Sequence, residues 1–111
     1  MHEMSITQSL VEACAAEAEA EGARVTRVTV EIGCLCGVMA DAVRFCYDVC
    51  AQGTALEGSR LDIVAVPGQA LCRDCGAAMA VDDWLALCAC GSANLGFSGG
   101  DELRIKEMEV V

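Results

Sequence analysis

The chain contains a single histidine, and it lies at residue 2, between Met1 and Glu3. The α-amine of Met1, the amide nitrogen of His2 and its imidazole are linked closely enough to chelate one ion. Nitrogen ligands disposed in a plane favour Ni(II) or Cu(II) over Zn(II) and Mg(II). Histidine is too bulky for ready trimming of the initiator, so we expect the amine to stay on Met1. A lone early histidine is also common in termini without function, and the remaining sequence must decide between the two interpretations.

Two closely spaced cysteine pairs form a second candidate metal site. Cys72 and Cys75 are separated by two residues, and Gly76 can take the positive φ of a tight metal knuckle. Cys88 and Cys90 form a second knuckle, which is one residue shorter than usual. Four thiolates are the ligand set of a closed, structural zinc site, so we predict one zinc on these cysteines. The alternative is a redox dithiol at Cys72 and Cys75, but no thioredoxin-like βαβ pattern surrounds that pair.

Five further cysteines bring the total to nine. Cys14, Cys46 and Cys50 lie on apolar helical faces, so we expect them to behave as small buried hydrophobic residues. Cys34 and Cys36 fall in a predicted loop, where a second metal site or a redox role stays open. The odd total favours metal binding or plain burial over disulfides.

Length and charge restrict the class of protein. A chain of 111 residues forms one domain, or a small domain that carries a smaller module. Its net charge of −10 argues against nucleic-acid binding and suits a protein that handles cations or meets a basic partner. The sequence has neither a basic n-region nor an apolar run of the roughly 18 residues that a spanning helix requires. We therefore expect no membrane segment, a reducing environment for the cysteines, and a cytoplasmic location.

Hydrophobic periodicity predicts an α/β arrangement in the first part of the chain. Ser5 and Gln8 form a capping box that predicts a helix start, and Gly22 is a suitable stop. Alternation predicts a strand from Val25 to Ile32, and a glycine-bearing loop follows it. The expected inner face of this first helix consists of Ile6, Leu10, Val11 and Cys14.

The second part of the chain combines a helix, two strands and the cysteine module. Asp41 can cap a second helix that Gly53 ends, and Leu61 to Val66 reads as a strand closed by Pro67-Gly68. Residues 71–91 change to a composition of cysteine, glycine and alanine, which indicates an inserted module. The tail from Glu102 to Val110 is typical of a strand, and its shift in alternation predicts a β-bulge. The expected inner face of the second helix consists of Val43, Cys46, Tyr47 and Cys50.

Several motifs, taken in order along nearly the whole chain, resemble the HypA/HybF family of nickel-insertion accessory proteins for [NiFe]-hydrogenase. They begin with the amino-terminal motif, continue through internal glycine motifs and the double cysteine module, and finish in the final strand. The motifs are Met1-His2-Glu3-Met4-Ser5, Val30-Glu31-Ile32-Gly33, Gly37-Val38, Gly53-Thr54, Glu57-Gly58, the four module cysteines, and Gly100-Asp101-Glu102-Leu103-Arg104-Ile105-Lys106-Glu107.

The resemblance implies a metallochaperone with an α+β fold, in which a small sheet packs on two helices and a zinc-ribbon-like module with four cysteines is inserted. We expect residues 1–68 and 100–111 to form the nickel-binding domain, and residues 69–99 the zinc-binding domain. Nickel is then assigned to Met1, His2 and Glu3, with Glu3 as an oxygen ligand or as a group that orients the imidazole. Zinc is assigned to Cys72, Cys75, Cys88 and Cys90.

The family also implies protein partners, a GTPase of the HypB type and the precursor of the [NiFe]-hydrogenase large subunit. No catalytic constellation is visible, so an enzyme is not expected, and a homodimer stays open. One departure concerns the second knuckle, which reads Cys88-Ala89-Cys90 where the family has Cys-Pro-x-Cys, and this puts the zinc geometry in question. The alternatives to a chaperone are a generic zinc-ribbon interaction module and a rubredoxin-like electron carrier with iron on four cysteines.

Overall fold

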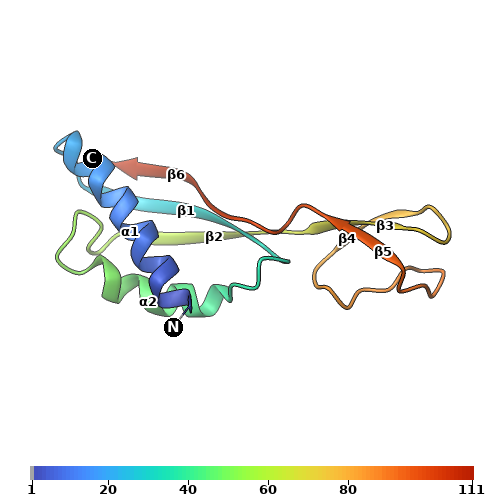
Figure 1. Ribbon diagram of the computed structural model, residues 1–111. Helices are drawn as coiled ribbons and strands as arrows, with labels where there is room; N and C mark the ends of the chain where they lie inside the picture. Colours follow the sequence, from blue (N-terminus) through green and yellow to red (C-terminus); the bar gives the residue numbers. More distant parts are fainter. Residues whose placement is uncertain (1) are drawn as a thin grey trace.

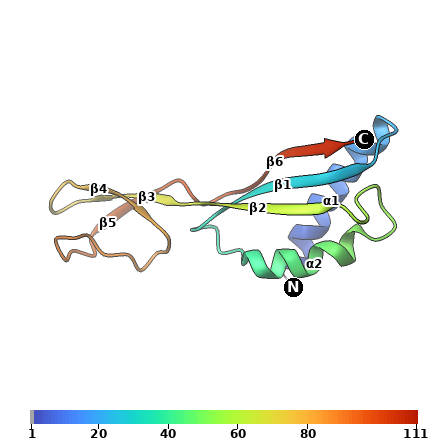
Figure 2. The same ribbon diagram turned by 180° about the vertical axis from the view of Figure 1, so that it is seen from behind.

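The computed structural model describes the backbone of residues 2–111 and the side chains of residues 3–111, and it has two parts. The molecule is elongated, with principal extents of 55 × 25 × 16 Å. Both helices and one sheet occupy one end, and a second, smaller sheet occupies the other (Figures 1 and 2). Within the described part, no helix is long and apolar enough to cross a bilayer.

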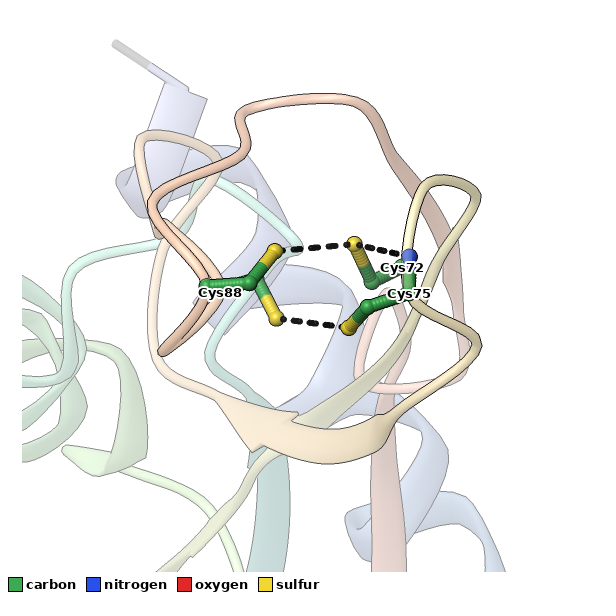
Figure 3. Close-up of side chains that lie close together, drawn as sticks. Cys72, Cys75 and Cys88 are labelled. Atoms are coloured by element: carbon green, nitrogen blue, oxygen red, sulfur yellow. Dashed lines mark hydrogen bonds between the residues drawn. The ribbon is translucent and has the colours of Figure 1, made fainter.

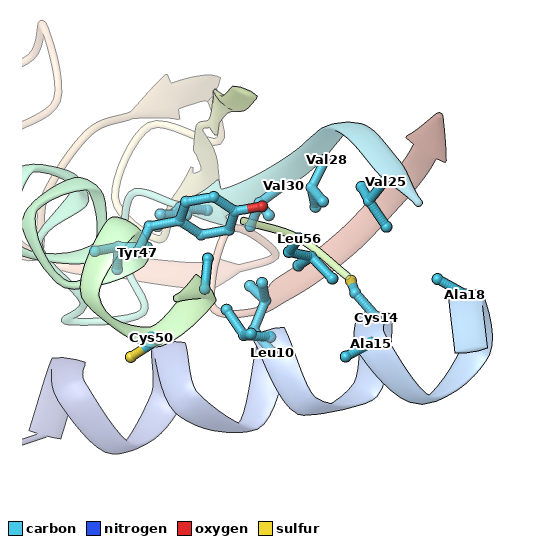
Figure 4. Close-up of a cluster of buried hydrophobic side chains, with 14 residues drawn as sticks. Leu10, Cys14, Ala15, Ala18, Val25, Val28, Val30, Tyr47, Cys50 and Leu56 are labelled. Atoms are coloured by element: carbon cyan, nitrogen blue, oxygen red, sulfur yellow. The ribbon is translucent and has the colours of Figure 1, made fainter. Parts of the chain in front are cut away.

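The larger sheet has the strand order β2-β1-β6. β1 (Val25–Gly33) pairs parallel with β2 (Arg60–Val66) and antiparallel with β6 (Leu103–Val110). α2 (Ala40–Ala51) connects the two parallel strands, as a parallel pair requires a crossover. Together with α1 (His2–Ala20), it covers one face of the sheet (Figures 1 and 4).

The main core lies between this sheet face and the two helices (Figure 4). Alternate residues of β1, such as Val28 and Val30, point into it because neighbouring side chains of a strand face opposite sides. The predicted inner faces are confirmed except at Ile6, which is half-buried. The buried members of the core are Leu10, Val11, Cys14, Ala15, Ala18, Val25, Val28, Val30, Ile32, Val43, Tyr47, Cys50, Ala51 and Leu56.

Both predicted helix caps are wrong. α1 is already helical at His2, so Ser5 lies inside the helix and the predicted capping box does not mark its start. The first turns of α1 pack beside α2, where the Cys50 thiol donates to the Met4 thioether at 3.6 Å, and this tertiary contact favours a longer helix. α2 begins at Ala40 after an extended Met39, and no side chain caps it. Asp41 lies instead in the first turn, where its charge complements the helix dipole.

The predicted bulge in the last strand is confirmed. Thr29 of β1 pairs with Glu107, but the next residue, Val30, pairs with Ile105. Lys106 is therefore the extra residue of β6 at this point. Such a bulge twists an edge strand and disfavours its pairing with other chains.

The smaller sheet has the order β4-β3-β5, with all pairs antiparallel. β3 (Gly68–Cys72) follows β2 after Pro67 alone, so the predicted stop at Pro67-Gly68 also begins the next strand. β4 (Ala78–Val81) and β5 (Leu95–Ser98) flank it. The small core of this end consists of Leu35, Ala70, Cys72, Val81, Cys88 and Leu95.

Leu35 connects the two ends of the molecule, because it belongs to the loop after β1 but is buried in the core of the smaller sheet. Its amide donates to the carbonyl of Gly100 at 2.7 Å. The chain segments pass so closely here that the two glycines at positions 33 and 68 have no room for a Cβ. A Cβ on Gly33 would lie 2.1 Å from the Gly100 oxygen, and one on Gly68 would lie 2.3 Å from a methyl group of Leu35. We call this contact of Gly33, Leu35, Gly68 and Gly100 the junction.

The Gly33→Ala substitution should destabilise the protein, because its methyl group would overlap backbone that cannot move without breaking the junction. We expect the free energy of unfolding to fall by about 1–3 kcal/mol or more. Gly96→Ala is the matched strand control, since its Cβ would meet only the end of the Arg73 side chain, at 3.3 Å. Denaturant unfolding measures both variants, and equal stabilities would contradict the steric account.

Candidate metal centres

The first cysteine knuckle begins where β3 ends. Cys72 is the last residue of that strand, and its carbonyl accepts a hydrogen bond from the Gly76 amide at 2.9 Å. Gly76 has a φ of +79°, which permits this tight turn at little cost. The Cys75 amide points at the Cys72 sulfur, 3.5 Å away. The knuckle therefore directs a backbone N–H dipole at a thiol, and the positive φ predicted for Gly76 is confirmed.

The second knuckle closes in spite of its missing residue. The amide of Cys88 donates to the carbonyl of Ser92 at 2.9 Å, and the amide of Gly91 donates to the carbonyl of Cys88 at 2.8 Å. Cys88 is buried whereas Cys90 is exposed. The short turn between them still sends both sulfur atoms toward the first knuckle.

The four sulfur atoms converge on one point between the knuckles. Cys72 Sγ lies 3.7 Å from Cys90 Sγ. Cys75 Sγ lies 3.5 Å from Cys88 Sγ, and Figure 3 shows this second pair. All four ligand atoms lie within 4.8 Å of one another. Zinc–sulfur bonds of about 2.3 Å in a tetrahedron place the sulfurs about 3.8 Å apart. The donor set and its spacing therefore fit one tetrahedral zinc ion.

Asp74 joins the two knuckles from outside the sulfur cluster. Its carboxylate accepts a hydrogen bond from the Ser92 hydroxyl and another from the Asn94 side-chain amide, the latter at 3.4 Å. The Ser92 hydroxyl in turn accepts a hydrogen bond from the backbone N–H of Asn94 at 3.0 Å. Sequence reasoning missed Asp74, because the bond joins residues that only the folded chain brings together.

The thiols influence one another strongly. The Cys75 amide, with a smaller contribution from Asp74, lowers the pKa of the Cys72 thiol to about 6. The backbone amide of Ser92 lowers the pKa of the Cys90 thiol. The three neighbouring thiols outweigh this effect and raise the pKa of Cys90 to about 12. The Ala77 amide likewise lowers the pKa of Cys75, yet Cys88 and Cys72 raise it overall. Four thiolates cannot coexist here without a cation, and a divalent ion supplies that compensation.

The other cysteines separate into two groups. Cys14, Cys46 and Cys50 are buried, which confirms the expectation of burial. Burial also raises the pKa of Cys14 and of Cys50, and this keeps both thiols neutral. Cys34 and Cys36 are half-buried on either side of Leu35, and the structure leaves the suggested second metal or redox role as a prediction.

Two of the predicted nickel ligands, His2 and Glu3, belong to the first turn of α1. Met1 and the side chain of His2 fall outside the described residues, so their assignment stays a prediction. Glu3 is half-buried in the first turn, and its carbonyl accepts a hydrogen bond from the Thr7 hydroxyl at 2.7 Å. This end of α1 lies beside α2, and it is the end of the helix nearer the smaller sheet (Figures 1 and 2).

A comparison with protein families places the whole arrangement in context. The family described as "Hydrogenase/urease nickel incorporation, metallochaperone, hypA" matches residues 1–110. A hydrogenase maturation factor HypA from Trichormus variabilis is 49% identical over 110 residues, covering 99% of this chain and 96% of the relative. The corresponding factor from Geobacter metallireducens is 50% identical over 111 residues, with 99% of each chain covered.

Two solved structures share the fold. The solution structure of a HypA protein is 26% identical, with a TM-score of 0.69 over 100% of this chain and 97% of that chain. The nickel metallochaperone HypA from Helicobacter pylori is 24% identical, with a TM-score of 0.65 over 98% of this chain and 97% of that chain. The predicted α+β class with an inserted four-cysteine module is therefore confirmed.

Replacing one module cysteine should release the metal and loosen the module, whose own core is small. Cys75→Ser protein is expected to lose most of its zinc and to become protease-sensitive around residues 71–91. Cys46→Ser is the control, because that thiol is buried on α2 outside the cluster. Elemental analysis of the purified proteins measures the metal and also distinguishes zinc from iron. Full zinc content in Cys75→Ser, or iron in the wild type, would contradict the assignment.

Proposed function

The chain belongs to the HypA family of nickel-incorporation metallochaperones, and we propose that it binds Ni(II) at its amino terminus and delivers the ion to a [NiFe]-hydrogenase. The observation that carries this proposal is the family match along residues 1–110. The family description names both hydrogenase and urease, whereas the relatives at 49–50% identity are named as hydrogenase maturation factors. Hydrogenase is therefore the favoured acceptor.

The proposed nickel ligands are the Met1 amine, His2 and Glu3. An imidazole ligand can come only from His2, because the chain has no other histidine. Amine and amide nitrogens select against Mg(II) and Ca(II), and an ion at a chain end remains accessible to an acceptor. Glu3 supplies an oxygen ligand or orients the imidazole, a role that ligand-adjacent carboxylates often have.

The zinc ion proposed for Cys72, Cys75, Cys88 and Cys90 has a structural task. A bound zinc joins the two knuckles and adds to a core of few buried residues. With four thiolates the coordination sphere is complete, so no position remains for a substrate. The proposed division assigns residues 69–99 to this zinc-binding domain, and residues 1–68 with 100–111 to the nickel-binding domain.

The proposed partners are a GTPase of the HypB type and the precursor of the hydrogenase large subunit. In this role the chain acts as a carrier rather than as an enzyme. A cytoplasmic location is supported by the nine cysteines, all of which are free thiols in the structure and so suit a reducing compartment. The family match favours this carrier over a generic zinc-ribbon module or an electron carrier with iron on four cysteines.

Nickel affinity should fall steeply on acidification, because the His2 imidazole and the Met1 α-amine must each lose a proton before they bind. Free imidazole titrates near ~6.5 and an α-amine near ~7.8, so most of the loss is expected between about pH 8 and 6. Isothermal titration of untagged protein with Ni(II) over this range measures the effect. Acetylation of the Met1 amine should weaken binding at every pH, because it removes one nitrogen ligand. Unchanged affinity in the acetylated protein would exclude the amine as a ligand.

The partner assignment is tested by co-purification from hydrogenase-producing cells grown with nickel. We expect both the GTPase and the large-subunit precursor to be recovered with a carboxyl-terminally tagged chain under conditions that preserve weak complexes. A chain with an unrelated cargo specificity would recover neither. Absence of both partners, with the chain itself folded and zinc-loaded, would count against delivery by direct contact.

A further inference from the structure

The loop between β4 and the second knuckle, residues 82–87, displays large apolar side chains to solvent. Leu85 is 88% exposed and Leu87 is 62% exposed. Between them, Ala86 packs against the small core of the module, so the two leucines flanking it are directed outward. Contiguous exposed apolar side chains with a polar rim are typical of protein-interaction sites.

The 82–87 loop is held in place rather than loosely exposed. The indole N–H of Trp84 donates to the Leu35 carbonyl at 3.1 Å, and its ring packs on Phe97 with centroids 4.9 Å apart. The Asp83 carboxylate accepts from the Leu85 amide at 2.8 Å. At its other end the loop runs directly into Cys88 of the sulfur cluster. A preorganised loop loses little conformational entropy on binding, which favours its use as a docking element.

Charge around the two leucines indicates the kind of occupant. Asp82 and Asp83 are both exposed, and within the part of the chain that the structure describes neither forms an ion pair. A matching surface therefore carries Lys or Arg at the border of an apolar pocket. A second copy of this chain would bring a further charge of −10, and anionic lipid would be repelled for the same reason.

We propose that the 82–87 loop is the docking element for the protein that receives the nickel, and that Leu85 and Leu87 enter an apolar pocket bordered by basic residues on that protein. This inference rests on the proposed function and adds the surface used. The Trp84 bond to Leu35 ties the docking loop to the junction, and the junction holds it in a fixed relation to the larger sheet.

The test uses the purified hydrogenase large-subunit precursor and the full-length, zinc-loaded chain. The double variant Leu85→Ser/Leu87→Ser should bind the precursor at least about tenfold more weakly, because buried apolar anchors dominate interface energies. Its zinc content should be unchanged, since both side chains are exposed. The matched control is Phe45→Ser/Val49→Ser, which removes side chains that are 79% and 56% exposed on α2. Asp82→Lys should weaken binding mainly through a slower association rate and should flatten its salt dependence.

The outcomes separate this inference from the proposed function. Failure of the wild-type chain to bind the precursor would contradict delivery by contact, and the docking inference with it. If the wild-type chain binds the precursor and the loop variant loses no more affinity than the α2 control, the proposed function stands. The inference that residues 82–87 form the docking element would then be refuted. If the wild-type chain sediments as a dimer and the loop variant as a monomer, the occupant is a second copy of the chain. If the wild-type chain binds phosphatidylcholine vesicles and the loop variant does not, the occupant is a lipid surface. Either result would refute the docking inference.

Discussion

The close approach of three backbone segments at the junction is the constraint on which the rest of the structure depends. Gly33, Gly68 and Gly100 meet where the chain passes between the two sheets, and a methyl group on any of them would overlap neighbouring atoms. Because the segments approach so closely, Leu35 can reach from the loop after β1 into the core of the smaller sheet. The two ends of the molecule are therefore joined by packing as well as by covalent connection.

The module beyond the junction depends on chemistry more than on apolar burial. Its core contains only six buried residues, and two of these, Cys72 and Cys88, are proposed zinc ligands. The crowding of thiols raises the pKa of Cys90 to about 12, so the cluster resists ionisation unless a cation is present. Metal binding and folding are coupled in such a site. The proposed zinc ion would hold both the knuckles and the loop that leads into Cys88.

The sequence predicted those features that depend on local patterns. Alternation located β1, β2 and β6, and the interrupted alternation near Lys106 correctly predicted a bulge. Cysteine spacing identified the four thiols that the structure brings together, including the short second knuckle. These predictions succeeded because strand periodicity and knuckle turns are set by residues close together in the chain.

Features that depend on tertiary contact could not be predicted in this way. The capping box at Ser5 was outweighed by packing of the first turn of α1 against α2, and Asp41 was not used as a cap. The Asp74 link between knuckles and the Trp84 bond to Leu35 join residues 18 to 49 positions apart. Such pairs carry no periodic signal, so only the folded chain reveals them.

The two proposed metals use separate ligand sets. The nickel cargo is held by nitrogen and oxygen atoms, and the structural zinc is held by sulfur atoms. X-ray absorption at the nickel and zinc edges of one untagged, doubly loaded sample tests this most directly. We predict a nickel shell of nitrogen and oxygen with the scattering of one imidazole, and a zinc shell of four sulfurs at about 2.3 Å. Sulfur in the nickel shell, or nitrogen and oxygen in the zinc shell, would contradict the separation of the two sites.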